Sequence, residues 1–192
     1  MLVKIGCLKF GNFTLKSGMK SPVYIDLRIL VSFPRQLQVI GQAYAQVLQN
    51  LEYDRLAAVP YAALPLCCAA SLATGKPWIY TRKEAKTDHG IAKPVEGLFK
   101  KGEKIVLIDD LVTNGLSKLE VIKPLEHIGL IVKDIVVLID REQGGEAELK
   151  EKGYQLHSVL KFTQMLEILK SEQKIDDDKY QQTIEFLHKT GK

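Results

Sequence analysis

The residues best suited to chemistry lie between positions 104 and 117, where an apolar run leads into Asp109 and Asp110 and then into a short polar loop. A core strand gains nothing from adjacent aspartates at its end, because burying unpaired carboxylates is costly. Ser117 and Glu120 have the spacing of a capping box, so we expect a helix to begin there and the backbone N–H groups of residues 113–117 to face one concavity. Such a concavity would bind a phosphate, whereas the alternative, an ordinary buried strand and turn, leaves the two acids unexplained.

Asp109 and Asp110 are well placed to bind hydroxyl groups beside that phosphate. Side chains alternate along a strand, so the two carboxylates leave on opposite faces at its carboxyl end, where open α/β sheets bind ligands. A ribose presents two hydroxyls near its 5′-phosphate, so the segment suits a phosphorylated sugar. The Walker B strand of an ATPase also ends in acids, but it requires a G-x-x-x-x-G-K-[ST] loop. No such loop is present, since Gly75-Lys76 is followed by Pro77.

The hydrophobic pattern around this segment indicates alternating strands and helices, which is typical of an α/β fold. The strand, the polar loop, a helix and a further apolar run form a crossover unit, so we expect a central, mostly parallel twisted sheet flanked by helices. An irregular exposed loop is expected over 81–97. Strands are expected at 56–59, 78–80, 105–109, 135–139 and 156–160, and helices at 34–50, 62–75, 117–127, 163–170 and 176–187.

The composition restricts the class of protein. With 192 residues, of which 46% are hydrophobic, the chain can bury a full core, and we expect a single domain over residues 1–192. The formal net charge of +4 is dispersed along the chain, which favours small anionic ligands over nucleic acid. Three cysteines, two of them adjacent, favour reduced thiols in a cytoplasmic protein. No apolar run is long enough to span a bilayer, so we expect no membrane partner.

The segment from 81 to 97 contains Arg82, Lys83, Lys86 and His89 but has neither a helical nor a strand period. It is either a solvated surface loop or a lid. If a bond breaks at the anomeric carbon of the sugar, a cationic centre forms and a departing diphosphate gains charge, which these side chains and Mg²⁺ would stabilise. Closure of a lid would also exclude water from the reacting centre.

Two further segments combine polar groups with turn residues. Arg141 follows the apolar run 135–139, so it would lie at the same sheet edge as Asp109, where its guanidinium could bind a carboxylate in bidentate fashion. The alternative is a plain Asp-Arg-Glu surface pair. Lys16 and Tyr24 lie in the other segment, where the alternatives are a solvated lysine and core packing.

Six motifs occur in a defined order along the chain: FGNFTLKSG at 10–18, SPVYID at 21–26, VPY at 59–61, RKEAK at 82–86, DDLVTNGLS at 109–117 and DREQGG at 140–145. In order and approximate spacing they resemble the motifs of the orotate phosphoribosyltransferases, and the resemblance extends over residues 10–187. The segments 157–159 and 165–169 are most similar to the transferase part of bifunctional UMP synthases. The resemblance implies the type I phosphoribosyltransferase fold, with about residues 1–33 contributing to a small N-terminal hood.

The same resemblance implies roles in transferring phosphoribose from 5-phosphoribosyl 1-diphosphate to orotate. Asp109 and Asp110 would hold the ribose hydroxyls, and residues 113–117 would hold the 5′-phosphate. The full set that would bind substrates is Lys16, Tyr24, Ile25, Tyr61, Ala62, Asp109, Asp110, Leu111, Val112, Thr113, Asn114, Gly115, Leu116, Ser117 and Arg141. The set that would act in catalysis is Arg82, Lys83, Lys86, His89 and Asp110.

Partners and product also follow from the resemblance. Mg²⁺ would be held mainly by the diphosphate, which Tyr61, Ala62 and Lys83 would also contact. The loop from 82 to 97 would reach the active site of the other subunit, which implies a two-fold homodimer. The product would be orotidine 5′-monophosphate, formed in the biosynthesis of UMP, and a fused or associated orotidine 5′-monophosphate decarboxylase is a further expected partner.

Two alternatives remain open. Leu116 stands where the family usually has Gly, Ser or Thr, which favours a regulatory protein that binds the diphosphate sugar without catalysis. Lys83, Lys86 and His89 favour an enzyme, because a sensor does not need to stabilise a leaving group. A phosphoribosyltransferase for another base would share the phosphate loop, but it would not explain Arg141, since those bases carry no carboxylate.

Overall fold

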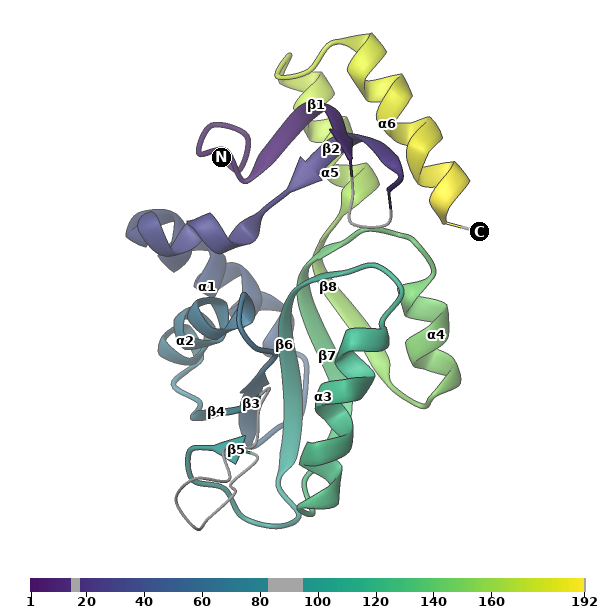
Figure 1. Cartoon of the computed structure of the whole chain (residues 1–192). Coiled ribbons are helices and arrows are strands. Elements are labelled where there is room, and N and C mark those ends of the chain that lie inside the picture. Colours follow the sequence, from purple (N-terminus) through teal and green to yellow (C-terminus); the bar gives the residue numbers. More distant parts are fainter. Residues whose placement is uncertain (15–17, 83–94, 192) are drawn as a thin grey trace.

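A six-stranded sheet forms the centre of the molecule, and the α/β class predicted from the sequence is confirmed (Figure 1). The computed structural model describes residues 1–14, 18–82 and 95–191. The strand order is β5-β4-β3-β6-β7-β8, in which the β4–β5 pair is antiparallel and the other pairs are parallel. The strands are β3 (Arg55–Ala58), β4 (Trp78–Thr81), β5 (Val95–Glu96), β6 (Lys104–Val112), β7 (Ile131–Asp140) and β8 (Gln155–Lys161).

Helices cover both faces of this sheet. One face packs against α1 (Pro34–Leu48), α2 (Ala63–Thr74) and α5 (Phe162–Ser171), and the other packs against α3 (Leu116–His127) and α4 (Gly145–Glu151). In β6, Val106 and Ile108 belong to the core on the α1 side, whereas Leu107 belongs to the core on the α3 side. A strand buried on both faces appears in the sequence as a continuous apolar run, which is why β6 and β7 could be recognised.

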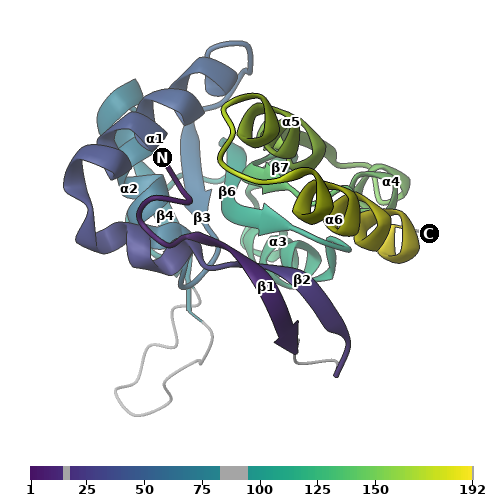
Figure 2. The same ribbon diagram turned by 90° about the horizontal axis from the view of Figure 1, so that it is seen from above.

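A separate two-stranded sheet lies over the carboxyl ends of the central strands, as Figure 1 shows. It consists of β1 (Leu8–Thr14) and β2 (Lys20–Ile25), which pair in antiparallel fashion and are followed by a 3-10 helix (Leu27–Ser32). The C-terminal helix α6 (Asp177–Thr190) packs against β2, and the view from above in Figure 2 shows it beside this hairpin. The hood predicted around residues 1–33 thus includes a C-terminal helix that the sequence did not place there.

The main helices confirm the predicted boundaries, and their end residues explain them. The predicted helix 62–75 corresponds to α2, whose C-cap Gly75 has φ of 69°, a left-handed conformation that glycine adopts readily. Asp176 caps α6, because its carboxylate accepts a hydrogen bond from the backbone N–H of Lys179. Of the described helices, none is long and apolar enough to cross a membrane.

Three predicted boundaries in the sheet were wrong. β6 does not end at Asp109 but continues to Val112, because it pairs with β7 as far as Asp140. β7 begins at Ile131, four residues earlier than predicted, through its pairing with the start of β6. The expected irregular segment 81–97 is shorter at both ends, since Thr81 belongs to β4 and pairs with Val95 of β5.

Candidate active site

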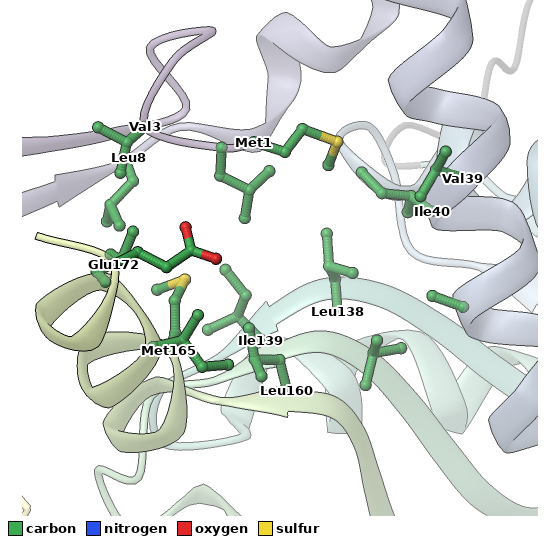
Figure 3. Close-up of a pocket in the computed structure, with 15 residues that line it drawn as sticks. Met1, Val3, Leu8, Val39, Ile40, Leu138, Ile139, Leu160, Met165 and Glu172 are labelled. Carbon is green, nitrogen blue, oxygen red and sulfur yellow. The ribbon is translucent and has the colours of Figure 1, made fainter. Parts of the chain in front are cut away.

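Two pockets differ sharply in chemical character. The first, shown in Figure 3, has a volume of 290 Å³ and lies between α1, the ends of β7 and β8, and α5. Its lining is mostly apolar, including Met1, Ile40 and Met165, and among the described residues that line it only Glu172 has a charged side chain. Apolar side chains neither donate to a phosphate nor accept from sugar hydroxyls. It is therefore not the site that the sequence motifs describe.

The second pocket has a volume of 230 Å³ and lies where β3 and β6 end. It brings together most of the residues that the sequence indicated, although they come from two distant segments of the chain. Its lining is Val59, Pro60, Tyr61, Ala62, Asp109, Asp110, Leu111, Thr113, Asn114, Gly115, Ser117 and Lys118. The carboxyl edge of a parallel sheet is where ligands bind in open α/β folds. We take this second pocket, called the polar pocket below, as the candidate active site.

The segment after β3 forms one wall of the polar pocket. The backbone N–H of Val59 donates to the carbonyl of Ile108 at 3.0 Å, which continues the pairing of β3 with β6 up to the pocket. Tyr61 and Ala62 follow directly and precede the first residue of α2, so both lie at a helix N-terminus. The peptide bond between Pro60 and Tyr61 is cis.

The loop from Thr113 to Ser117 forms the opposite wall, but the predicted capping box is wrong. Helix α3 begins at Leu116, and its N-cap is Gly115, with φ of 78° and no side-chain cap hydrogen bond. Ser117 therefore lies inside the first turn, where it cannot cap the helix. A side chain at Gly115 would also bring its Cβ to 3.0 Å from Leu149 Cγ, so both backbone conformation and space favour glycine there.

Leu116 and Val112 do not contribute side chains to the polar pocket. Leu116 is 52% exposed and is absent from the lining of the pocket, so its side chain does not fill it. Val112 is fully buried in the core between the sheet, α3 and α4. The backbone of this loop is thus open to a ligand in the pocket without either side chain filling it.

The two aspartates face opposite sides of β6, as strand alternation predicted, and they differ in their partners. The carboxylate of Asp109 is buried, at 4% exposure, and its Oδ2 lies 2.7 Å from Nζ of Lys118 on α3. Its Oδ1 accepts a hydrogen bond from the backbone N–H of Asp110. The hydroxyl of Tyr44 on α1 donates to the backbone carbonyl of Asp109 at 2.7 Å. The strand is thus held from both faces at the point where the pocket opens.

Asp110 is the more accessible of the two acids. Its Oδ1 accepts the backbone N–H of Leu111 at 2.9 Å. Burial, followed by the negative charge of Asp109, raises the pKa of Asp110 to about 7. A carboxyl group with a pKa in this range, at the mouth of a pocket, is a common feature of functional sites.

Lys118 lines the polar pocket but was missed by the sequence interpretation. The sequence did contain a signal, because Lys118, Ile122 and Leu125 have the spacing of a buried helical stripe. A lysine in an apolar stripe indicates either a boundary of the core or a buried ion pair. Here the structure shows the buried ion pair.

Arg141 follows the end of β7, next to the phosphate loop, and its backbone N–H donates to the carbonyl of Val112 at 3.1 Å. Arg141 is not among the residues that line the polar pocket, and its buried side-chain Nε has no hydrogen-bond partner among the described residues. Burial lowers the pKa of the guanidinium, because the charged form is removed from water. A buried donor of this kind requires explanation, and a bound anion is one that fits its charge.

Gly145 explains how the segment after Arg141 packs so closely on the phosphate loop. A Cβ at this position would lie 2.6 Å from Val112 Cγ2 and 2.7 Å from the carbonyl oxygen of Thr113. Only glycine permits this approach of α4 to the loop. The DREQGG motif therefore places both an arginine and the packing surface of the phosphate loop.

The remaining predicted site residues lie away from the polar pocket or outside the described residues. Tyr24 and Ile25 lie on β2 of the hood, where the ring of Tyr24 stacks at 5.5 Å from that of Phe13. Arg82 follows β4 and forms an ion pair with Glu96 of β5. Lys16, Lys83, Lys86 and His89 lie outside the described residues. Among the described residues, no group of three or more His, Cys, Asp or Glu side chains could hold a metal ion.

Comparison with known proteins supports the resemblance seen in the sequence. No protein-family model matches the chain. The orotate phosphoribosyltransferase of Pyrococcus horikoshii is 34% identical over 167 residues, which cover 86% of this chain and 89% of that protein. The uridine 5′-monophosphate synthase of Bos taurus is 39% identical over 192 residues, which cover 99% of this chain and 40% of that protein.

Solved structures give the same result. The UMP synthase of Leishmania donovani superposes with a TM-score of 0.89 at 42% identity, covering 98% of this chain and 41% of that chain. The chain spans only 37% to 40% of the length of the bifunctional relatives that it matches. It nevertheless covers most of the separate transferase from Pyrococcus horikoshii. The chain therefore belongs to the orotate phosphoribosyltransferase family.

Proposed function

We propose that the chain transfers phosphoribose from 5-phosphoribosyl 1-diphosphate to N1 of orotate, giving orotidine 5′-monophosphate and diphosphate in pyrimidine biosynthesis. The observation that carries this proposal is a pocket that contains a phosphate-type loop and an acidic pair, together with Arg141, whose backbone N–H bonds Val112 at the start of that loop and whose buried Nε has no hydrogen-bond partner among the described residues. These three features match the three charged or polar parts of the two substrates.

The loop from Thr113 to Ser117 is proposed to bind the 5′-phosphate. It precedes α3, which is 12 residues long, so the phosphate would lie at the positive end of a helix dipole. Leu116 lies outside the lining of the pocket, and backbone N–H groups can therefore hold the phosphate whatever the side chain at that position. This removes the main support for a regulatory protein that cannot catalyse.

The acidic pair is proposed to meet the pentose. A carboxylate accepts hydrogen bonds from vicinal hydroxyls and also favours positive charge that develops on the sugar ring as the bond to diphosphate breaks. Asp110 is only half-buried and lines the pocket, whereas Asp109 is buried against Lys118. The two carboxylates thus differ in how accessible they are to a ligand.

Arg141 is proposed to bind the carboxylate of orotate. Among the described residues, its buried Nε donor has no partner, and an Arg–carboxylate pair makes charge-assisted, bidentate hydrogen bonds. Uracil and the purine bases lack a carboxylate and would leave this donor unpaired. This favours orotate over the other bases.

The leaving diphosphate is proposed to be held by the pocket wall at Tyr61 and Ala62, with Arg82, Lys83, Lys86 and His89 acting from the adjoining segment. Mg²⁺, when bound, would neutralise charge on the diphosphate. The described residues fit a metal held mainly by substrate oxygens, because Asp110 is the one accessible carboxylate in the pocket lining and no all-protein metal cluster is present among them.

Two further proposals concern the setting of the enzyme. A cytoplasmic homodimer, in which the segment 82–97 reaches the other subunit, accords with the family and is tested by the oligomeric state and by mixing subunits with different defects. An orotidine 5′-monophosphate decarboxylase is proposed as a fused or associated partner, because the matched relatives include a bifunctional PyrF/PyrE protein and UMP synthases.

The test of the proposed function is an assay of orotate consumption with 5-phosphoribosyl 1-diphosphate and Mg²⁺, run beside uracil, hypoxanthine and adenine. We expect turnover of orotate alone and none when the donor is omitted. Turnover of another base would identify a different phosphoribosyltransferase. Tight donor binding without any turnover would identify the regulatory alternative.

A further inference from the structure

We propose that Glu142 is a positioning residue, which fixes the turn between β7 and α4 so that Arg141 can bind the carboxylate of orotate. This inference rests on the proposed function, because it concerns how the orotate site is assembled. The sequence places Glu142 beside Arg141, but it does not indicate what the Glu142 side chain contacts. Its role follows from the conformation of its backbone and from the partner of its carboxylate.

Glu142 has an unusual backbone conformation. Its φ is 56°, in the left-handed region, which a residue other than glycine adopts at a cost because its Cβ approaches the following carbonyl oxygen. Its backbone N–H donates to Oδ1 of the buried Asp140 at 2.8 Å, which closes a tight turn around Arg141. Residues in such a conformation persist where their surroundings hold them, and they are common at functional sites. The turn therefore depends on contacts that hold it in place.

The carboxylate of Glu142 ties this turn to helix α5. Its Oε2 accepts a hydrogen bond from the backbone N–H of Thr163 at 2.8 Å. Thr163 lies in the first turn of α5, where backbone N–H groups have no acceptor within the helix and the helix dipole favours a negative charge. The helix is itself held in the core by Phe162 and Leu166, which are fully buried. Glu142 thus connects the turn to a firmly packed element.

The residues on either side of Glu142 hold the turn at two further points. The backbone N–H of Arg141 donates to the carbonyl of Val112, at the start of the phosphate loop. The side-chain Nε2 of Gln143 donates to Oγ1 of Thr190 at the end of α6, the helix that packs against β2 of the hood. The turn therefore joins the phosphate loop, α5 and the hood, and Arg141 lies within it.

Arg141 depends on this arrangement because the direction of its side chain is set by the turn and by packing. Among the described residues, its buried Nε has no hydrogen-bond partner that could orient it. A guanidinium binds a carboxylate in bidentate fashion only when the two planar groups are aligned. A turn that is held before orotate arrives keeps this alignment and reduces the entropy lost on binding. Loss of the Glu142 contact should therefore weaken the binding of orotate.

The experiment compares Glu142→Ala with Glu142→Gln in steady-state kinetics, with orotate as the varied substrate. A hydrogen bond to a charged group is worth about a factor of ten or more, so we expect Glu142→Ala to raise the KM for orotate about tenfold. The kcat should change by less than about twofold, because the orotate carboxylate keeps its charge during the reaction and binds equally in the ground and transition states. Glu142→Gln keeps an oxygen that can accept from Thr163, so its KM should stay within about threefold of the unmodified value.

Gln173→Ala is the matched control. Gln173 has a φ of 54°, close to that of Glu142, but it is exposed and follows the C-terminal end of α5. Both alanine variants thus place the same residue in the same backbone conformation, and only Glu142→Ala removes a contact that holds the turn. We expect Gln173→Ala to leave the kcat and the KM for orotate unchanged.

A spectroscopic measurement follows Arg141 without requiring turnover. The chain contains five arginines, so a nitrogen–proton correlation spectrum holds few Nε–H signals, and Arg141→Met identifies the signal of Arg141 by its absence. The buried Nε–H should exchange slowly with water. In Glu142→Ala we expect this exchange to become about tenfold faster or more, whereas Glu142→Gln and Gln173→Ala should retain the slow exchange.

The inference is overturned if Glu142→Ala keeps both the KM for orotate and the slow exchange of the Arg141 signal. It is also overturned if Glu142→Ala lowers kcat without raising that KM, or if Glu142→Gln behaves like Glu142→Ala, since the carboxylate would then act in some way other than by holding the turn.

If Glu142→Ala does not fold, Glu142→Gly takes its place, because glycine adopts the left-handed conformation readily but lacks the carboxylate. The same rise in the KM for orotate is expected, and an unchanged KM would overturn the inference. An unmodified protein that does not consume orotate would refute the proposed function, and the Arg141 signal would still decide the role of Glu142.

Discussion

Replacing Arg141 with methionine should make the free protein more stable and at the same time remove its recognition of orotate. In the part of the chain that the structure describes, the buried Nε of Arg141 has no hydrogen-bond partner, and burial disfavours the charged guanidinium. An unsatisfied buried donor costs about 1–3 kcal/mol. Methionine keeps the apolar stem without that donor, so the free energy of unfolding should rise by an amount within this range.

The expected change in thermal stability is measurable. For a domain of this size, each 1 kcal/mol changes the melting temperature by about 2–4 °C. Arg35→Met is the matched control, because Arg35 lies exposed on α1, and its replacement should leave the melting temperature nearly unchanged. Thermal unfolding without ligands measures this part of the prediction.

The effect on orotate should be opposite and large. Hydrogen bonds to a charged group contribute about 1.5–3 kcal/mol each, so loss of a bidentate pair removes about 3 kcal/mol or more, which corresponds to at least about a hundredfold in kcat/KM for orotate. The KM for 5-phosphoribosyl 1-diphosphate should change little. Arg141→Lys should lose most of the same activity, because it keeps the charge but not the fork. A less stable Arg141→Met protein with unchanged kcat/KM for orotate would refute the reasoning.

Three other perturbations test neighbouring parts of the site. Gly145→Ala places a Cβ 2.6 Å from Val112 Cγ2, so it should displace the phosphate loop and weaken ribose 5-phosphate binding by about 1–3 kcal/mol, measured by calorimetry. Folding raises the pKa of Asp110 from 3.8 to about 7, so between these pH values the folded state binds more protons than the unfolded state. The free energy of unfolding should therefore fall as pH rises from about 4 to 7. Denaturant unfolding at several pH values measures this fall, and Asp110→Asn should abolish the part that Asp110 causes. Lys86→Ala should lower kcat far more than it weakens substrate binding, because a lysine beside the departing diphosphate acts on charge that develops in the transition state. An unchanged kcat would show that this residue has no part in the mechanism.

The central sheet could be predicted because its inner strands are buried on both faces. β6 and β7 therefore appear as continuous apolar runs, and only their ends were misplaced, where pairing with a neighbour extends a strand through polar residues such as Asp109. The hood strands gave no such signal. A register shift between Phe10 and Phe13 interrupts their alternation, and most of their residues are partly exposed. Helix α4 has seven residues, too few to show a helical period.

The polar pocket could be predicted in outline from residue types and order, but its internal pairing could not. Adjacent acids before a polar loop indicate a phosphosugar site, and both acids do line one pocket. That Lys118 pairs with Asp109 depends on which face of β6 packs against α3, which adjacent sequence positions do not specify. The burial of Arg141 Nε without a partner among the described residues is likewise a property of the folded protein, which residue order does not specify.

A crystal structure of the complex with orotidine 5′-monophosphate tests the central claim most directly. The account predicts that the phosphate accepts hydrogen bonds from the backbone N–H groups of residues 113–117, that the ribose hydroxyls reach Asp110, and that the orotate carboxylate meets Arg141. A nucleotide bound elsewhere, or one whose carboxylate leaves Nε of Arg141 unpaired, would contradict it.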